Sequence, residues 1–269
     1  MTEVTNQDGA VGVVAELWRY PVKSMQGERL QSAELGPSGL AGDRRYGLIG
    51  AGGRLLSAKS VPELFSAGAR TEGNRVVITL PDGTDVLADD ADASALLSRW
   101  LGREVELRET GSGAVSYELT FDPPNDDAEM VSWPAMADSF LDLAPVNALT
   151  TASLARMAAV APDTAWDVRR FRPNVLVDTG SVEGFVEDGW VGGDVALGDG
   201  GAALHVDMAS VRCAMPLRAQ PAWAGAPALE RDIAVFKALT DEHNYHLGIY
   251  CGVASAGTVT VGDPVRPTP

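Results

Sequence analysis

The segment Val211-Arg212-Cys213-Ala214-Met215 follows Ala203-Leu204-His205-Val206-Asp207, and these two stretches guide the interpretation of the whole chain. Apolar and polar residues alternate in the earlier stretch, which predicts a β-strand with one buried face. Cys213 is therefore expected just beyond a strand and beside a guanidinium, which favours the thiolate that binds soft metals. With only two cysteines in the chain, a disulfide scaffold or a zinc finger is nearly excluded.

Composition narrows the class of protein. The chain has 269 residues, 45% of them hydrophobic, and a net charge of −16. That charge argues against nonspecific binding to nucleic acid or to an anionic membrane. No apolar run reaches the ~20 residues that span a bilayer, and the polar first residues show no signal peptide. We expect a cytoplasmic protein with reduced cysteines.

Short apolar stretches bounded by turns recur along the chain and predict strands. The clearest is a hairpin over residues 75–87, because Asp82-Gly83 suits a turn with positive φ. Helical spacing predicts three helices, over residues 90–101, from Thr150 onward with a threonine N-cap, and over residues 228–243. The pattern predicts an α+β fold that is predominantly β, with two β-barrel-like domains and a few helices. The connection between them is placed within residues 109–139.

Three separate motifs place a cation beside a hydrogen-bonding group at a strand end. They are residues 20–24 (YPVKS), residues 170–174 (RFRPN) and Arg212-Cys213. Loops at strand ends could converge on one anionic ligand, and each charge-assisted bond to a phosphate is worth roughly 1.5–3 kcal/mol. A thiolate beside a phosphate site implies a ligand that carries both a phosphate and a soft metal. A molybdenum pterin fits this description.

The ordered set of motifs resembles the proteins that join an N-terminal MOSC β-barrel domain to a MOSC domain. The chain is similar to the mitochondrial amidoxime-reducing components and their bacterial relatives. The resemblance implies a MOSC β-barrel domain over residues 12–125, a MOSC domain over residues 126–269, and a cofactor site between them. The matching segments are residues 20–24, 42–46, 171–174, 212–213, 248–250 and 257–263.

The resemblance also implies roles for individual residues. In that family the molybdenum cofactor (Mo-molybdopterin) lies between the domains, and the cysteine that matches Cys213 ligates the metal. Cys213 is thus the expected catalytic residue and metal ligand. The residues that match cofactor contacts are Lys23, Ser24 and Arg44 in the first part, and Thr150, Thr151, Arg172, Asn174, Arg212 and Tyr250 in the second.

The activity that the resemblance implies is reduction of N-hydroxylated compounds, N–O to N–H, by oxygen-atom abstraction at the Cys-ligated molybdenum centre. A separate electron-donor protein (a flavoprotein, ferredoxin or cytochrome) is expected, because the sequence has no flavin, haem or iron–sulfur signature. Two alternatives remain open. One is a cofactor carrier or sulfur-transfer module with a persulfide on Cys213, and the other is a homologue that binds the cofactor without turnover.

The residues on both sides of Arg212-Cys213 depart from the amidoxime-reducing family. Val211 stands where the family has serine, and Ala214-Met215-Pro216 replaces a stretch with threonine. Because these positions border the metal in the family, they are expected to affect substrate preference.

Other cations and the second thiol have simpler interpretations. Arg169 and Arg170 are expected on a solvated face, whereas Arg172 is assigned to the site because Pro173-Asn174 follows it. Cys251 lies in an apolar strand and is expected in the core.

Overall fold

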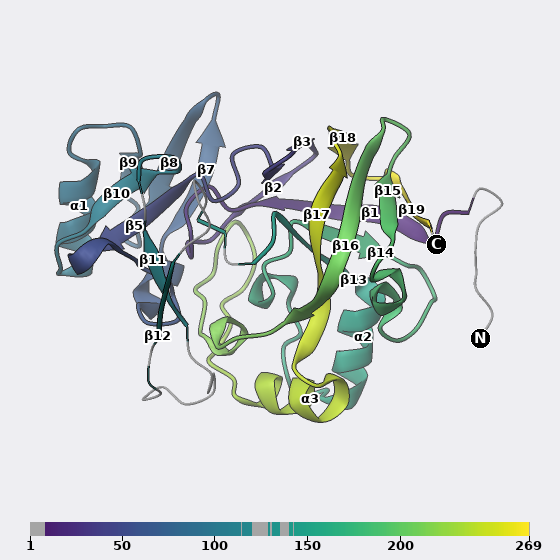
Figure 1. Cartoon of the computed structure of the whole chain (residues 1–269). Coiled ribbons are helices and arrows are strands. Elements are labelled where there is room, and N and C mark those ends of the chain that lie inside the picture. Colours follow the sequence, from purple (N-terminus) through teal and green to yellow (C-terminus); the bar gives the residue numbers. More distant parts are fainter. Residues whose placement is uncertain are drawn as a thin grey trace.

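The structure is a computed structural model, and it describes residues 9–113, 115–119, 129, 131–134, 140–141 and 143–268. Strands dominate it (Figure 1), so the predicted α+β, predominantly β fold is confirmed. The predicted connection includes residues 122–127, which lie outside the described residues. The division into residues 12–125 and 126–269 stays a prediction.

Seven of the described strands close into a barrel, and an eighth extends its sheet. In spatial order they are β14 (Val175–Asp178), β13 (Val146–Thr150), β17 (His246–Ser255), β16 (Ala202–Val211), β15 (Asp194–Leu197), β19 (Pro264–Thr268), β1 (Gly12–Arg19) and the added β2 (Glu28–Leu30). The barrel closes because β1 also pairs with β14. Each of the seven barrel strands therefore has a neighbour on both sides, whereas β2 pairs only with β1.

Strand β1 brings the first part of the chain into a barrel otherwise built from residues 146–268. Val14 and Leu17 are buried in its core, and Leu17 lies opposite Val175. Since β1 and β14 are antiparallel, the residues after β1 lie beside those that precede β14. The backbone N–H of Trp18 accordingly donates to the carbonyl of Asn174 at 2.8 Å. Two of the three sequence motifs therefore meet at one end of the barrel.

Smaller sheets accompany the barrel, and most of their strands belong to residues 46–134 (Figure 1). The predicted hairpin over residues 75–87 is confirmed, with Gly83 at φ +85° in its turn. The five-stranded sheet contains β10 (Glu106–Glu109), β5 (Tyr46–Gly50), β6 (Arg54–Leu55), β11 (Ser116–Leu119) and β12 (Val131–Pro134). The hairpin sheet contains β7 (Gly68–Glu72), β8 (Arg75–Thr79) and β9 (Asp85–Leu87), and a third contains β18 (Gly257–Thr260), β3 (Ser32–Gly36) and β4 (Gly39–Leu40).

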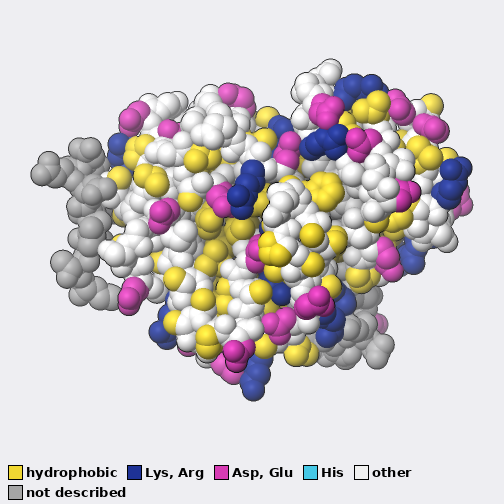
Figure 2. All heavy atoms as spheres, turned by 180° about the vertical axis from the view of Figure 1, so that it is seen from behind, with side chains coloured by type: hydrophobic (Ala, Val, Ile, Leu, Met, Phe, Trp, Pro, Cys, Tyr) yellow, Lys and Arg dark blue, Asp and Glu magenta, His cyan; other side chains and the backbone are white. Residues whose placement is uncertain are grey.

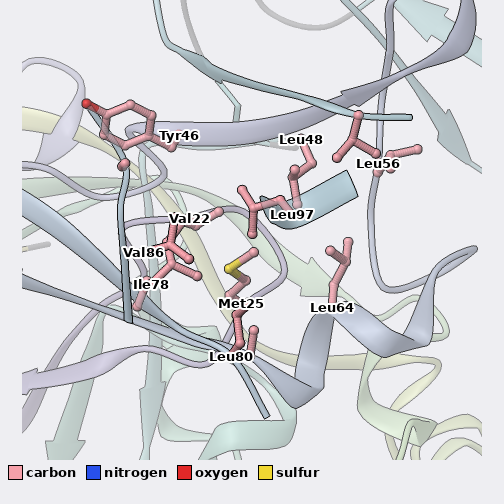
Figure 3. Packing of buried hydrophobic residues seen from close by; sticks show 14 of the residues in the cluster. Val22, Met25, Tyr46, Leu48, Leu56, Leu64, Ile78, Leu80, Val86 and Leu97 are labelled. Atoms are coloured by element: carbon pink, nitrogen blue, oxygen red, sulfur yellow. The ribbon is translucent and has the colours of Figure 1, made fainter. Parts of the chain in front are cut away.

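The loop after β1 is fixed by hydrophobic packing against the core of the hairpin sheet and its neighbours. Val22 and Met25 point into the same core as Ile78 (Figure 3). Burial of side chains of this size contributes about 1.5–3 kcal/mol each. Lys23 and Ser24 stand between the two anchors, so their backbone is held in place.

Three α-helices are described: α1 (Ala93–Leu101), α2 (Thr151–Val160) and α3 (Ala234–His243). Helix α1 ends at Gly102, which has φ +64° as its predicted stop requires. The predicted N-cap of α2 is confirmed, because the Thr150 side chain accepts a hydrogen bond from the Ser153 N–H at 3.1 Å.

The third helix is shorter than predicted, and the prediction is wrong for residues 228–233. Leu229 and Gln220 exchange both backbone hydrogen bonds, at 2.7 and 2.8 Å. The N–H of Asp232 donates to the carbonyl of Leu217 at 3.0 Å. These tertiary bonds occupy the backbone groups that a helix would need, and they outweigh the helical spacing of the apolar residues.

Charges of both signs are mixed over the face shown in Figure 2, while hydrophobic side chains gather near its middle. In the described ranges, the helices are all too short or too polar to cross a lipid bilayer.

Gly68 is expected to be intolerant of a side chain, because it lies where the two parts of the molecule meet. A Cβ at this position would come within 1.9 Å of the Trp223 ring, which is itself fixed by a hydrogen bond from its Nε1 to the Gly27 carbonyl. Gly68→Ala should lower the free energy of unfolding by about 1–3 kcal/mol in urea denaturation. Gly36→Ala is the control, since a Cβ there meets nothing within 4 Å, and equal losses in both variants would contradict this interpretation.

Candidate functional site

One cavity collects most of the candidate residues, and it lies where the ends of β1, β16 and the start of β14 meet. The candidates that line it are Lys23, Arg44, Arg172, Asn174, Arg212, Cys213 and Tyr250. Ser24, Thr150 and Thr151 are not among the described residues that line it. The structure therefore brings together residues from both parts of the chain, and it leaves the start of α2 outside.

Three candidates have left-handed backbone conformations, with φ of +66° at Ser24, +47° at Arg44 and +51° at Arg172. For residues other than glycine this conformation costs on the order of 1 kcal/mol, and such strain clusters at ligand sites. The sharp turns let the side chains of Arg44 and Arg172 approach the same aromatic ring.

That ring belongs to Tyr20, the first residue after β1. The guanidinium carbon of Arg172 lies 4.0 Å from the ring centroid and that of Arg44 lies 4.5 Å from it. Burial raises the pKa of the Tyr20 phenol, so the ring stays neutral. Its hydroxyl donates to the Pro173 carbonyl at 3.3 Å. Tyr20 is thus a platform that holds two cations at the cavity.

Asp43 connects the two parts of the site. Its Oδ1 accepts from the Tyr20 backbone N–H at 2.8 Å, and its Oδ2 accepts from Asn174 Nδ2 at 3.0 Å. The same carboxylate forms an ion pair with Arg44, and its side chain is buried. Sequence reasoning gave Asp43 no role. The motif around residue 43 was the only signal that could have indicated one.

Asn174 lines the cavity, but both ends of its amide are bonded within the protein. Its Oδ1 accepts from the Asn147 N–H at 3.1 Å, while Nδ2 donates to Asp43 and to the Trp18 carbonyl. The two asparagines are also joined by a backbone bond of 2.7 Å, from Asn174 N–H to Asn147 O. Asn174 therefore joins β13 to the residues after β1.

The guanidinium of Arg212 is enclosed by oxygen acceptors. Its Nε donates to the Leu247 carbonyl at 2.7 Å and its Nη1 to the Phe171 carbonyl at 3.0 Å. Its Nη2 reaches Asn147 Oδ1 at 3.4 Å. A Cβ at Gly248, which has φ +80°, would lie 3.1 Å from Nη2. Glycine at this position leaves room for the guanidinium.

Arg170 also lines the cavity, although the sequence placed it elsewhere. The prediction that Arg169 and Arg170 form a solvated face is wrong, because both are buried and Arg170 is only 2% exposed. Arg170 donates to the carbonyls of Ala165, Pro216 and Glu230 at 2.8, 2.9 and 2.9 Å. These acceptors come from separate loops, so no local pattern in the sequence could have indicated them.

The cavity has an excess of positive charge. Among the described residues, the hydrogen bonds that Arg170 and Arg212 donate go to neutral oxygens rather than to carboxylates. Asp232 and Asp167 act on the Arg170 charge from outside the cavity, and no described lining residue is acidic. Burial lowers the pKa of both guanidinium groups, because desolvation disfavours the charged form. An anion in the cavity would offset that cost.

Cys213 is a half-buried free thiol in the same cavity. Ionised Cys213 and Tyr250 would raise the pKa of Arg212, opposing the effect of burial, so the thiol is close enough to interact with this cation. Cys251, in contrast, is wholly buried in the barrel core, as the sequence predicts. Burial raises the pKa of the Cys251 thiol, which keeps it protonated.

The rest of the lining is largely apolar. We call Leu141, Leu143, Val211 and Met215 the apolar wall, because all four line the cavity. Lys23 lies beside one end of this wall, because its Nζ donates to the carbonyl of Phe140, the residue before Leu141, at 2.7 Å.

Thr150 and Thr151 have partners at the start of α2 instead. Thr150 donates to Glu187 Oε2 at 2.6 Å, and Ser153 donates to the same oxygen at 2.8 Å. Thr151 donates to Asp178 Oδ1 at 3.2 Å. These hydroxyls fix the helix start to its neighbours.

Glu187 should make stability depend on pH. Burial raises the pKa of its carboxyl, so above about 4.3 the unfolded chain releases a proton that the folded protein keeps. The free energy of unfolding should therefore fall as pH rises through this window, by about 1.4 kcal/mol per pH unit. Glu187→Gln should lose that slope in urea denaturation between pH 4 and 8. The exposed Glu183→Gln is the control, and an unchanged slope in Glu187→Gln would contradict the assignment.

The donor set fits an anionic cofactor that carries a soft metal. Lys23, Arg44, Arg170, Arg172 and Arg212 supply cations from both parts of the chain, and none of the described lining residues is acidic. Lysine and arginine bind phosphate well, and a thiolate binds soft metals. The cofactor that the resemblance implies is molybdopterin with molybdenum, which carries both a phosphate and a soft metal.

Two family models match the chain. The model for the MOSC N-terminal beta barrel domain matches residues 11–117, and the model for the MOSC domain matches residues 137–266. Human mitochondrial amidoxime reducing component 2 is 27% identical over 293 residues, which covers 95% of this chain and 83% of the relative. Mouse mitochondrial amidoxime-reducing component 1 is 26% identical over 287 residues, with 95% and 82% covered. A solved structure of the YUAD protein from Bacillus subtilis aligns over 94% of this chain and 93% of that one, with 11% identity and a TM-score of 0.41.

Proposed function

This chain joins a MOSC N-terminal β-barrel domain to a MOSC domain, and from that premise we propose that it is a molybdenum-cofactor-dependent reductase of N-hydroxylated compounds. Its similarity to mitochondrial amidoxime-reducing components over most of the chain supports a function related to the molybdenum cofactor. The names of those relatives describe reduction of an amidoxime, an N–O compound.

The observation that most supports this function is that a free thiol and buried cations share one cavity. Cys213 is the only cysteine among the described lining residues. Arg170 and Arg212 keep their charge buried there while bonded to neutral oxygens. Such charges are costly unless an anion approaches them, and a bound phosphate would supply it.

Each residue then has a role that follows from its contacts. Arg170 and Arg212, with Lys23 and Arg172, would bind the cofactor phosphate and pterin, and Arg44 is held on Tyr20 beside them. The Cys213 thiolate would ligate the molybdenum. When bound, the cofactor supplies the two-electron abstraction of oxygen from the N–O bond. The protein supplies binding and orientation.

The reaction needs a partner for electrons. Reduction of N–O to N–H consumes two electrons and two protons and releases water. A separate flavoprotein, ferredoxin or cytochrome would deliver the electrons. We place the protein in the cytoplasm, where thiols such as Cys213 stay reduced.

Steady-state assays of cofactor-loaded protein test this proposal. With reduced viologen as donor, the wild type should reduce an amidoxime and a hydroxylamine to the amine, while Cys213→Ala should lose at least about a hundredfold in rate. Cys251→Ala is the control for loss of a thiol and should retain activity. Full cofactor occupancy without turnover of either substrate would contradict the proposal. Transfer of cofactor or of a persulfide from Cys213 to an acceptor protein would instead support the carrier alternative.

A further inference from the structure

The apolar wall has unusually exposed members for a cavity that is otherwise cationic. Leu143 is 53% exposed and Val211 is 45% exposed, yet both line the cavity that contains Cys213. Val211 is two residues from the thiol in sequence. When a ligand covers large apolar side chains in a cavity, the removal of their surface from water favours binding.

The apolar surface continues outward along the barrel. Met208 on β16 lies opposite Tyr250 on β17, so their side chains share one face of the sheet. Tyr250 lines the cavity, its hydroxyl donates to the Val211 carbonyl at 3.5 Å, and Met208 is exposed. A strip from Val211 to Met208 thus leads from the thiol to the surface.

The other side of the wall begins beside Phe140, which is anchored within the protein. Phe140 is buried in a small core with Ile49 and Leu55, and its carbonyl accepts from Lys23 Nζ. These contacts hold Phe140, the residue that directly precedes Leu141. A neighbour that is already held in place lowers the entropy that Leu141 loses when an apolar group packs on it.

We propose that the preferred substrates carry a bulky apolar group, aryl or alkyl, next to the N–O bond. The group packs on Leu143 and Val211 while the N–O bond faces Cys213. This inference rests on the proposed function and adds the class of substrate. A small-molecule group is favoured over a protein partner, because the wall belongs to the same cavity as the thiol rather than to a separate flat surface.

The test compares two amidoximes with the same reacting group. For cofactor-loaded wild type, kcat/KM for cyclohexanecarboxamidoxime should exceed that for acetamidoxime by at least about tenfold. Val211→Ser and Leu143→Ser should each reduce this ratio about threefold or more, with molybdenum content unchanged. Val191→Ser is the matched control, since Val191 is also 45% exposed and is not among the described lining residues, and its ratio should equal that of the wild type.

A binding measurement separates failure of this inference from failure of the proposed function. Cyclohexanecarboxamide, which cannot be reduced, should bind more tightly than acetamide in saturation-transfer NMR, and Val211→Ser should remove the difference. If both amidoximes are reduced with a ratio near one, the inference is overturned and the function stands. If neither is reduced but the carboxamide binds preferentially, the wall is supported and the function is overturned. If Val211→Ser lowers only the rate with a donor protein, the wall belongs to that partner and the inference is overturned.

Discussion

Cys213→Ala is expected to lower the molybdenum content of the purified protein to less than about a tenth of the wild-type content. The thiol is the only group among the described lining residues that can become an anionic sulfur ligand, because the other sulfur, of Met215, is a neutral thioether. Its removal leaves cations that can bind a phosphate but no thiolate for the metal. Mass-spectrometric elemental analysis, normalised to protein, measures the effect.

The control for this variant is Cys251→Ala, which removes the other thiol from the barrel core. It should keep its molybdenum even if it is somewhat less stable, because Cys251 is enclosed by apolar side chains. Unchanged molybdenum in Cys213→Ala, or equal losses in the two variants, would contradict the assignment of Cys213 as ligand.

Arg212→Met should reduce the bound pterin by about 10- to 100-fold, because a charge-assisted bond to phosphate contributes about 1.5–3 kcal/mol. Methionine keeps an unbranched apolar stem but removes the buried charge and the bonds to the Leu247 and Phe171 carbonyls. Oxidation of the released pterin to a fluorescent product quantifies the loss.

Arg108→Met provides the comparison, since the Arg108 guanidinium pairs with Glu106 at the surface. That variant should retain its pterin. If Arg212→Met retains it as well, with a wild-type circular dichroism spectrum, Arg212 does not bind the cofactor. A matched loss in both variants would indicate a general effect of charge rather than a site.

Local features of the sequence were predictable where a short pattern decides the structure. The Asp-Gly turn of the 75–87 hairpin, the Thr150 N-cap and the Gly102 stop all depend on neighbouring residues, and all three are found. The burial of Cys251 was predictable for the same reason, because the residues before and after it in its strand are mostly apolar.

The site was predictable only as a set of motifs, because its geometry depends on distant pairings. Strand β1 closes a barrel built mostly from residues beyond 146, and this pairing brings Lys23 and Asn174 to the same cavity. Arg170 was missed because its three acceptors lie in separate loops. The start of the third helix was wrong because Leu229 pairs with Gln220 across a turn. None of these partners is within reach of a local pattern.

Asn174 illustrates the limit of assigning a role from residue type. Its amide was expected to meet the cofactor, and its residue does line the cavity. The structure shows both ends of that amide bonded to the protein, on Asp43, Trp18 and Asn147. An amide on a loop can serve a ligand or the fold equally well, and only its neighbours decide between them.

X-ray absorption at the molybdenum edge of cofactor-loaded wild-type protein would examine the metal–sulfur bond itself. The spectrum should require one sulfur ligand beyond those of the pterin dithiolene, both in the wild type and in Cys251→Ala. A first coordination sphere containing dithiolene sulfur alone would mean that position 213 does not bind the metal, and the account given for this cavity would be wrong.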